Sequence, residues 1–339
     1  MKRIPAAGLY SAAGILFNVP METTSFSEFE ARLRELLEEK QYLRIINLIE
    51  DEGERYPDQQ TYLAYWRIGM AARDDNPDLA MQYLDELIEE GVWVSQYLLR
   101  SSPSLEPLQD YPEYEERVQA MAELQRREAA QLLPLLTLRR DEEMVPGSDP
   151  YPLLVGLHQD RDTALASIRL WQPAAAAGWL VGVPQSTQAL WSGAYVWEDI
   201  VQAQREIADH TRGLIETYNV DTNRVILAGH RQGGEVAAWL PCSGGIDVRG
   251  FIAVAPTGAM IANPDRWFHS LQANEPQGLR GALITGDIGM PYLPEMKRLA
   301  DILNAFDVPT NLHVLEGVGT DYDPAYHAAI RQAIDFVLS

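Results

Sequence analysis

The second part of the chain, from about residue 133 onward, alternates short apolar runs with segments of helical spacing. The apolar runs predict strands at about 135–138, 153–157, 179–183, 225–228, 251–255, 282–284 and 312–315. Helices are predicted near 163–175, 197–218, 233–239, 293–306 and 324–338. Because most of these strands are apolar without interruption, helices must cover both faces of a mainly parallel sheet. The pattern predicts a doubly wound α/β domain over 133–339, with ligands at the carboxyl ends of its strands.

The part of the chain before residue 133 lacks such runs and is predicted to be helical. Helices are expected to begin at Ser25 or Ser27, after Lys40, and at about 59–73, 77–91 and 113–131, with a loop-rich stretch over 101–116. Helices joined by short loops indicate helical hairpins, and Ala80 followed by Leu84 resembles the packing positions of a tetratricopeptide repeat. We expect an all-α helical-hairpin domain over 23–132. A helical cap on the second domain is an equally good interpretation.

Residues 1–22 superficially resemble a signal peptide, because Met1-Lys2-Arg3 precedes a mildly apolar run. Polar residues, prolines and glycines break that run, and no convincing cleavage site follows. The chain also lacks an apolar stretch of about 18 residues, which a transmembrane helix requires. We therefore expect a disordered leader on a cytoplasmic protein.

The charge balance excludes several classes of partner. The chain has 27 basic and 49 acidic residues among 339, for a formal net charge of -22. Binding to nucleic acid or to an anionic membrane needs a basic surface, so neither partner is expected. Cys242 is the single cysteine, which excludes an internal disulfide and a thiolate-rich metal site. We expect Cys242 to be a small buried side chain. The sequence does not predict an oligomeric state.

The strand predicted at 225–228 leads directly into a glycine-rich run, which reads Gly229-His230-Arg231-Gln232-Gly233-Gly234. A strand, a tight glycine turn and a helix in this order are the context of a nucleophile elbow, G-x-S-x-G. The glycines permit a turn so sharp that the central residue is strained and its side chain projects alone into the site. The helix that follows stabilises negative charge at its N-terminus.

With this motif, residues 135–339 resemble the α/β-hydrolase superfamily, in its carboxylesterase and phospholipase-like branch, where the elbow usually reads Gly-Phe-Ser-Gln-Gly-Gly. Leu157-His158 matches the start of that family's Leu-His-Gly oxyanion loop. Further matches are Gly178-Trp179-Leu180, Pro184-Gln185-Ser186, Val220-Asp221, Arg224-Val225, Gly286-Asp287 and Gly317-Val318-Gly319. The resemblance implies an esterase-like α/β-hydrolase fold.

The catalytic positions that the resemblance assigns are all substituted. The nucleophile position holds Arg231, whose guanidinium is not a nucleophile at neutral pH. The acid position holds Gly289, the base position holds Thr320, and Gln159 replaces the glycine of the oxyanion loop. A catalytic triad works as a unit, so the loss of one member costs about a thousandfold or more. We therefore expect a non-catalytic protein that binds a ligand or interacts with a partner.

Polar side chains predicted at the strand ends are the candidate pocket residues. They are His158, Gln159, Asp160, His230, Arg231, Gln232, Asp287 and Asp321. Arg231 either pairs with an aspartate and fills the old pocket, or binds an anionic small molecule with its bidentate fork beside a helix N-terminus. We expect strained backbone at Arg231, because Gly229 and Gly233 are both present. His230 is expected to pack away from the pocket.

Two other functions stay open. An active hydrolase could use non-standard residues, such as His158, Asp287 or Asp321, to activate water. Alternatively, the helical part could bind a protein partner while the α/β part serves as a platform. No metal or cofactor is expected, because metal-ligand spacings are absent and the phosphate-loop and dinucleotide signatures are incomplete.

Three aromatic residues follow the strand predicted at 179–183, namely Trp191, Tyr195 and Trp197. They either line the cleft or pack between the sheet and the helical part. His327 follows the base position by seven residues and is expected to be a surface or packing residue.

Overall fold

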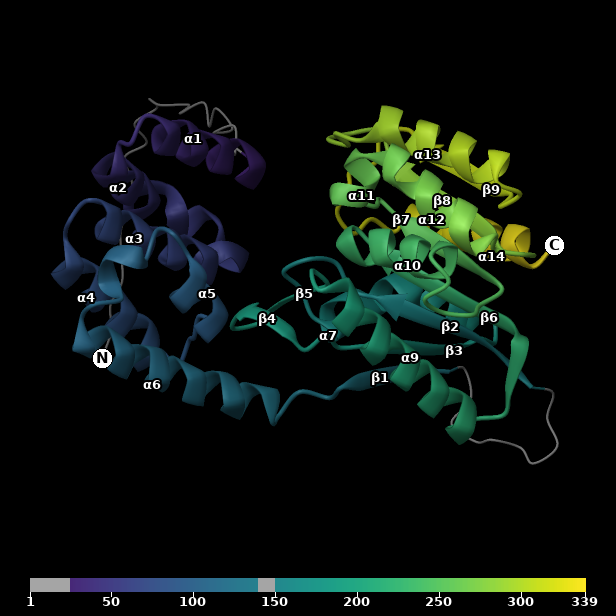
Figure 1. The fold of residues 1–339 in the computed structure, drawn as a ribbon, viewed down its shortest axis with the longest axis horizontal. Coiled ribbons are helices and arrows are strands. Elements are labelled where there is room, and N and C mark those ends of the chain that lie inside the picture. Colours follow the sequence, from purple (N-terminus) through teal and green to yellow (C-terminus); the bar gives the residue numbers. More distant parts are fainter. Residues whose placement is uncertain (1–24, 140–149) are drawn as a thin grey trace, which may run out of the picture.

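The computed structural model describes residues 25–139 and 150–339, so the leader predicted over 1–22 lies outside the described residues. Figure 1 shows a helical domain on the left and an α/β domain on the right. The chain passes from one to the other between α6 (Pro112–Ala129) and β1 (Leu135–Leu138). No helix in the described ranges is long and apolar enough to span a membrane.

The helical domain consists of consecutive helices packed on one another, as the sequence predicts. Besides α6 these are α1 (Phe26–Glu38), α2 (Tyr42–Glu52), α3 (Gln60–Arg73), α4 (Pro77–Glu89) and α5 (Gln96–Ser101). Ser25 begins α1 with a capping box, since its hydroxyl accepts from the Glu28 amide and the Glu28 carboxylate accepts from the Ser25 amide. Helix α5 is not predicted from the sequence. It has six residues and buries Leu99 alone, so its apolar pattern is too short to recognise.

The α/β domain is built on a seven-stranded sheet in the order β1-β3-β2-β6-β7-β8-β9. The strands after β1 are β2 (Tyr151–Leu157), β3 (Leu180–Pro184), β6 (Val220–His230), β7 (Gly250–Val254), β8 (Arg280–Gly286) and β9 (Thr310–Leu315). Strand β1 pairs antiparallel with β3, and the other pairs are parallel. The predicted mainly parallel sheet is confirmed.

Helices cover both faces of this sheet. Helices α8 (Gln172–Ala176) and α14 (Tyr326–Leu338) lie on one face, and α9 (Ile200–Thr217), α10 (Gln232–Cys242), α12 (Trp267–Asn274) and α13 (Leu293–Ala305) lie on the other. In β7, Ile252 packs towards α14 whereas Phe251 packs towards α13. Every residue of β7 is buried, as expected for a strand with two covered faces. This doubly wound arrangement is the α/β-hydrolase fold.

The helix prediction for this domain needs one correction, and it also misses two short helices. The helix predicted at 163–175 is divided into α7 (Ala164–Ser167), a 3-10 turn and α8. The division occurs because proline fits only the first turn of a helix, and Pro173 therefore lies in the first turn of α8. Helix α12 and the single turn α11 (Ala259–Ala262) are not predicted from the sequence.

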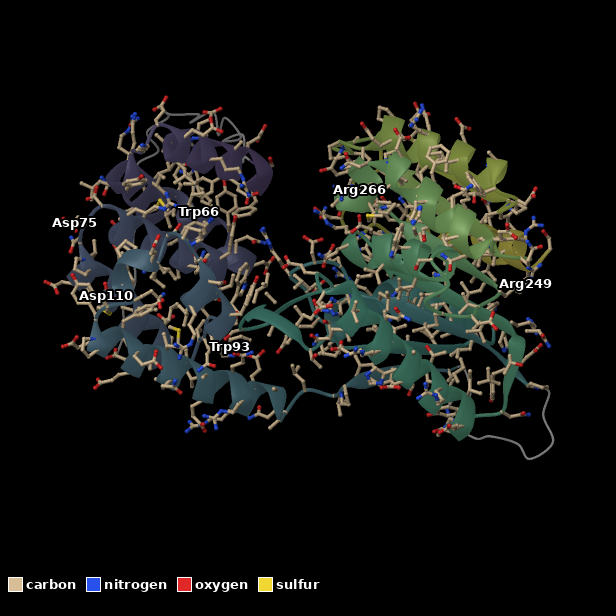
Figure 2. The ribbon with its side chains drawn as sticks, in the orientation of Figure 1. Trp66, Asp75, Trp93, Asp110, Arg249 and Arg266 are labelled. Atoms are coloured by element: carbon tan, nitrogen blue, oxygen red, sulfur yellow. The ribbon has the colours of Figure 1, made fainter. Side chains whose placement is uncertain are left out.

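A hairpin made of β4 (Gln188–Trp191) and β5 (Ala194–Val196) joins the two domains (Figure 1). Trp191 belongs to the core of the helical domain, where its ring stacks on Tyr62 with a centroid separation of 5.4 Å. The Ser192 amide donates to the Trp93 carbonyl over 3.0 Å, and Figure 2 shows Trp93 on the side of the helical domain that faces this hairpin. Trp191 and Tyr195 therefore pack between the sheet and the helical part, and Trp191 also lines a cavity between the domains.

The carboxylate of Glu128, on α6, accepts three hydrogen bonds at this junction. The donors are the indole of Trp93 (2.8 Å), the amide of Gly193 (3.2 Å) and the hydroxyl of Tyr195 (2.8 Å). The indole and the phenol are both buried. Glu128 thus connects the helical domain to the hairpin of the α/β domain.

We expect Glu128→Ala to lower the free energy of unfolding by about 3 kcal/mol, because buried donors that lose a charged acceptor are left unsatisfied. Urea denaturation measures the effect. Glu123→Ala is the matched control on the same helix, since Glu123 forms solvent-exposed pairs with Arg126 and Arg127 and should cost less than about 1 kcal/mol. Equal losses in the two variants would show that Glu128 does not hold the junction.

Candidate functional site

The nucleophile elbow is present between β6 and α10. Arg231 at its centre has φ 48° and ψ -117°, a backbone conformation that is unfavourable for a residue with a side chain. A Cβ atom on Gly229 would overlap the backbone of Gly233, and one on Gly233 would overlap the carbonyl of His158. The strained elbow predicted from the two glycines is confirmed.

The backbone of Arg231 is held by hydrogen bonds to the end of β7 and to the loop after it. Its amide donates to the Val254 carbonyl over 2.9 Å, and its carbonyl accepts from the Thr257 amide over 3.2 Å. Residue 231 therefore presents its side chain at the carboxyl end of the sheet, where this fold binds its ligands.

The Arg231 guanidinium meets three neighbours there. Its Nε donates to Asp160 over 3.4 Å, and its Nη1 donates to the Thr320 hydroxyl over 3.2 Å. Nη1 also lies 3.7 Å from the carboxylate of Asp321. The Arg231 and Asp160 side chains are about 30% exposed, at 28% and 30%, whereas Asp321 is 92% exposed. The structure thus shows Arg231 paired with the protein's own aspartates, and the pair with Asp321 is the more solvated one.

The two other positions that the resemblance assigns to a triad lie in neighbouring loops. Thr320, at the base position, touches Arg231 directly, so the nucleophile and base positions adjoin. Gly289, at the acid position, lies in the turn after β8 with φ 67°. The Ile288 amide donates to the Val318 carbonyl over 3.0 Å, which holds that turn against the loop that carries Thr320. The side chains at these three positions are a guanidinium, a hydroxyl and a hydrogen atom.

His158 is fully buried and both of its ring nitrogens are used. Nε2 accepts from the Ser186 amide over 3.2 Å, so Nδ1 carries the proton and donates to the Gln159 carbonyl over 2.7 Å. Burial lowers the pKa of His158 to about 4, against the opposing effect of the bond to Gln159 and of Asp160. Trp197 covers the ring, with centroids 4.8 Å apart. His158 is therefore a neutral structural residue beneath the site.

His230 is buried and packs beneath the loop of residue 320. Its Nε2 lies 2.9 Å from the Thr320 carbonyl, and its ring packs near Tyr326. Burial lowers the pKa of His230 to about 4, and the Arg231 cation adds to this effect. His230 thus anchors the loop of the base position from below.

The remaining candidates serve local structure. The carboxylate of Asp287 accepts from the Gly317 amide over 2.8 Å, and Gln232 accepts from the Trp197 amide over 2.7 Å. Gln159 donates to Asp162 over 3.1 Å, and burial raises the pKa of that aspartate. Of the predicted pocket residues, the structure therefore brings Asp160, Arg231 and Asp321 into one cluster, together with Thr320.

A cavity of about 350 Å³ lies beside this cluster, between the two domains. Its lining includes Asp160, Trp191 and Gln232, which the sequence names as candidates, and also Tyr62, Tyr65, Arg161, Glu198 and Thr257, which the sequence does not identify. The Arg161 guanidinium lies 4.4 Å from the centroid of the Tyr62 ring and 5.9 Å from that of Trp191. Tyr62 and Tyr65 could not be found from the sequence, because they belong to the helical domain and no motif connects the two domains.

Metal ligands do not gather in the described part of the chain, where no three His, Cys, Asp or Glu side chains form a metal-binding group. Cys242 is buried, as predicted, and burial raises the pKa of its thiol. His327 contacts Tyr322, with 3.3 Å between Nε2 and the phenol oxygen.

Comparison with known proteins gives distant structural likenesses. No protein-family model matches the chain, and no curated protein matches it. An uncharacterized protein from Bacillus cereus is 22% identical over 93% of this chain and 99% of that one, with a TM-score of 0.49. Two Staphylococcus aureus proteins, the fluorophosphonate-binding serine hydrolase FphF and the S-formylglutathione hydrolase FrmB, are 16% and 15% identical, each over 60% of this chain and 92% of theirs. Their TM-scores are 0.45 and 0.47. Likenesses this remote say nothing about the activity of this protein.

Proposed function

We propose that this protein is a non-catalytic member of the α/β-hydrolase fold that binds a small ligand beside Arg231. The observation that carries the proposal is the strained elbow with an arginine at its centre. The fold keeps the turn that normally presents a nucleophile, although Arg231 cannot act as one. The cavity of about 350 Å³ beside the elbow provides the space for a ligand.

The contacts of the other polar residues weigh against a hydrolase with a non-standard mechanism. A water-activating base needs a free acceptor in the site. His158 uses both ring nitrogens in bonds to backbone groups, and one oxygen of Asp287 is committed to the Gly317 amide. The carboxylate of Asp321 is almost fully exposed and lies 3.7 Å from the Arg231 guanidinium, so it is shared between solvent and that cation.

An anionic ligand would have to compete with the two aspartates that Arg231 contacts. Asp160 is the stronger competitor because it is the closer and the less exposed of the two. The carboxylate of Asp321 lies 3.7 Å from Arg231 Nη1 and its side chain is 92% exposed, so solvent weakens the ion pair between Asp321 and Arg231. We propose that a carboxylate or phosphate ligand displaces Asp321 and leaves the pair with Asp160 in place.

A comparison of the wild-type protein with Arg231→Ala tests both parts of the proposal. Neither protein should hydrolyse p-nitrophenyl esters above the buffer rate or react covalently with a fluorophosphonate probe. Phosphate or acetate should raise the melting temperature of the wild type more than that of Arg231→Ala, because bound ligand stabilises the folded state. Hydrolysis by the wild type that Arg231→Ala abolishes would show the non-catalytic assignment to be wrong. Equal shifts in melting temperature would exclude Arg231 as the anion ligand.

A further inference from the structure

A second cavity, of about 620 Å³, lies between the domains beside the β4–β5 hairpin. Helices α5 and α6 line it from the helical domain, and the segments 187–190 and 196–202 line it from the α/β domain. It shares Leu190, Val196 and Glu198 with the cavity beside Arg231. Its volume falls within the usual range for small-molecule sites, about 300–1,000 Å³.

Four side chains in the lining of this second cavity have no hydrogen-bond or ion-pair partner among residues 25–139 and 150–339. They are Gln96, Tyr97, Gln125 and Glu198. Two amides, a phenol and a carboxylate together offer several donors and acceptors. Tyr97 is 68% exposed, so its ring also presents an open apolar face. These groups come from both domains and face one space.

The polar residues around these four are already fixed. The Gln188 side chain donates to the Asp199 carbonyl over 3.0 Å and accepts from the Asp199 amide over 2.7 Å. The Gln202 side chain donates to the Thr187 hydroxyl over 2.7 Å. The carboxylate of Asp199 begins α9 by accepting from the amides of Val201 and Gln202. A wall fixed in this way loses little conformational entropy when a ligand binds.

The charge of the lining restricts the class of ligand. No lysine or arginine is among its lining residues in the described part of the chain, so an anion has no cation to bind. The carboxylate of Asp199 is committed to the start of α9, which leaves Glu198 as the single free charge. One exposed carboxylate binds a cation weakly. The lining therefore suits a neutral ligand with many hydroxyl groups, since each hydroxyl can donate to a carboxylate and accept from an amide.

We propose that this second cavity is a binding site for a saccharide of one or two units. The amides and the carboxylate bind sugar hydroxyls, and the Tyr97 ring packs against the apolar face of a pyranose. Because residues of both domains line the cavity, a bound saccharide also bridges the domains. Arg231 does not line this cavity, so saccharide binding can be tested independently of the function proposed above.

Ligand-observed NMR with methyl glucoside, methyl galactoside, methyl xyloside and methyl cellobioside tests the proposal on the full-length protein. We expect at least one of them to show saturation transfer, and Tyr97→Ala and Glu198→Gln each to weaken its binding roughly tenfold, which corresponds to about 1.4 kcal/mol. Both side chains are exposed, so both variants should fold. Phe268→Ala is the matched control, since Phe268 is an exposed aromatic residue on α12.

Two results would overturn the proposal. One is the absence of saturation transfer from all four glycosides. The other is binding that Tyr97→Ala and Glu198→Gln leave unchanged or that Phe268→Ala weakens equally. Agmatine and benzoate serve as cationic and anionic comparison probes. Binding of either one that depends on Tyr97, without glycoside binding, would also show that the assignment to a neutral ligand is wrong.

Discussion

Serine at position 231 alone will leave the protein inactive towards esters, whereas restoring all three catalytic positions will create an esterase. We expect Arg231→Ser/Gly289→Asp/Thr320→His to hydrolyse p-nitrophenyl acetate on the order of 10²-fold faster than the wild type, which is the lower range of general-base catalysis. Arg231→Ser should match the wild type, because a serine hydroxyl without a base is a poor nucleophile. Steady-state rates of folded, freshly purified proteins measure the difference.

The structure supports this expectation at each position. Arg231 keeps the strained backbone that presents a nucleophile, and the Thr320 side chain already reaches residue 231. No atom lies within 4 Å of a Cβ added to Gly289, and aspartate tolerates positive φ better than most residues. The bond between Ile288 and Val318 holds the acid and base loops together.

A variant without a nucleophile, Arg231→Ala/Gly289→Asp/Thr320→His, is the control and should be inactive. It separates attack by the introduced serine from hydrolysis by the introduced histidine alone. If Arg231→Ser by itself reached the rate of the triple variant, another group in the site would be acting as the base. The view that the site has lost its triad chemistry would then be wrong.

The fold could be predicted largely because its strands are buried on both faces. A run such as Phe251 to Val254 has to be apolar throughout, and such a run is visible in the sequence. The β4–β5 hairpin escaped prediction because its strands have four and three residues. The Ser192-Gly193 turn was a usable signal, since Gly193 has a φ of 71° there. The surface that the hairpin covers belongs to another domain, which no local pattern reveals.

The site could be predicted only as far as the backbone determines it. The elbow glycines identify residue 231 and its strain, and both are present as expected. Which side chains Arg231 meets depends on how three separate loops fold. Asp160 and Asp321 turn towards it, whereas Asp287 turns to the Gly317 amide. His158 also lies at a strand end, but its ring accepts a hydrogen bond from the buried Ser186 amide. No sequence pattern indicates the orientation of Asp287 or of His158.

Lowering the pH from 7 to 5 should reduce the free energy of unfolding by about 4 kcal/mol, because His158 and His230 are buried in their neutral forms. An unfolded histidine has a pKa of about 6.5, whereas burial lowers both pKa values to about 4 in the folded protein. Between these values the unfolded chain binds protons that the folded chain does not, so stability falls as the pH falls. Above pH 6.5 both states are neutral and this contribution to the pH dependence disappears. Urea denaturation at pH 7, 6 and 5 measures the loss.

His230→Phe isolates the contribution of one histidine. Phenylalanine keeps a planar ring at this buried position, so we expect the fold to accept it. Each histidine should account for about 2 kcal/mol of the loss between pH 7 and pH 5, and the variant should therefore lose about half as much stability as the wild type. His269→Gln is the control, because it removes an exposed histidine and leaves both buried histidines in place.

The acidic surface makes the comparison between variants more informative than the absolute loss. With 49 acidic against 27 basic residues, a fall in pH also reduces repulsion within the folded protein, which opposes the effect of the histidines. That opposing effect is nearly the same in the wild type and in His230→Phe, so it cancels in their difference. An equal loss in both proteins would mean that the pKa of His230 is the same in the folded and unfolded states, so that burial does not lower it. The hydrogen bond to the Thr320 carbonyl would not distinguish the two cases, because Nε2 donates to it in the neutral and in the charged ring.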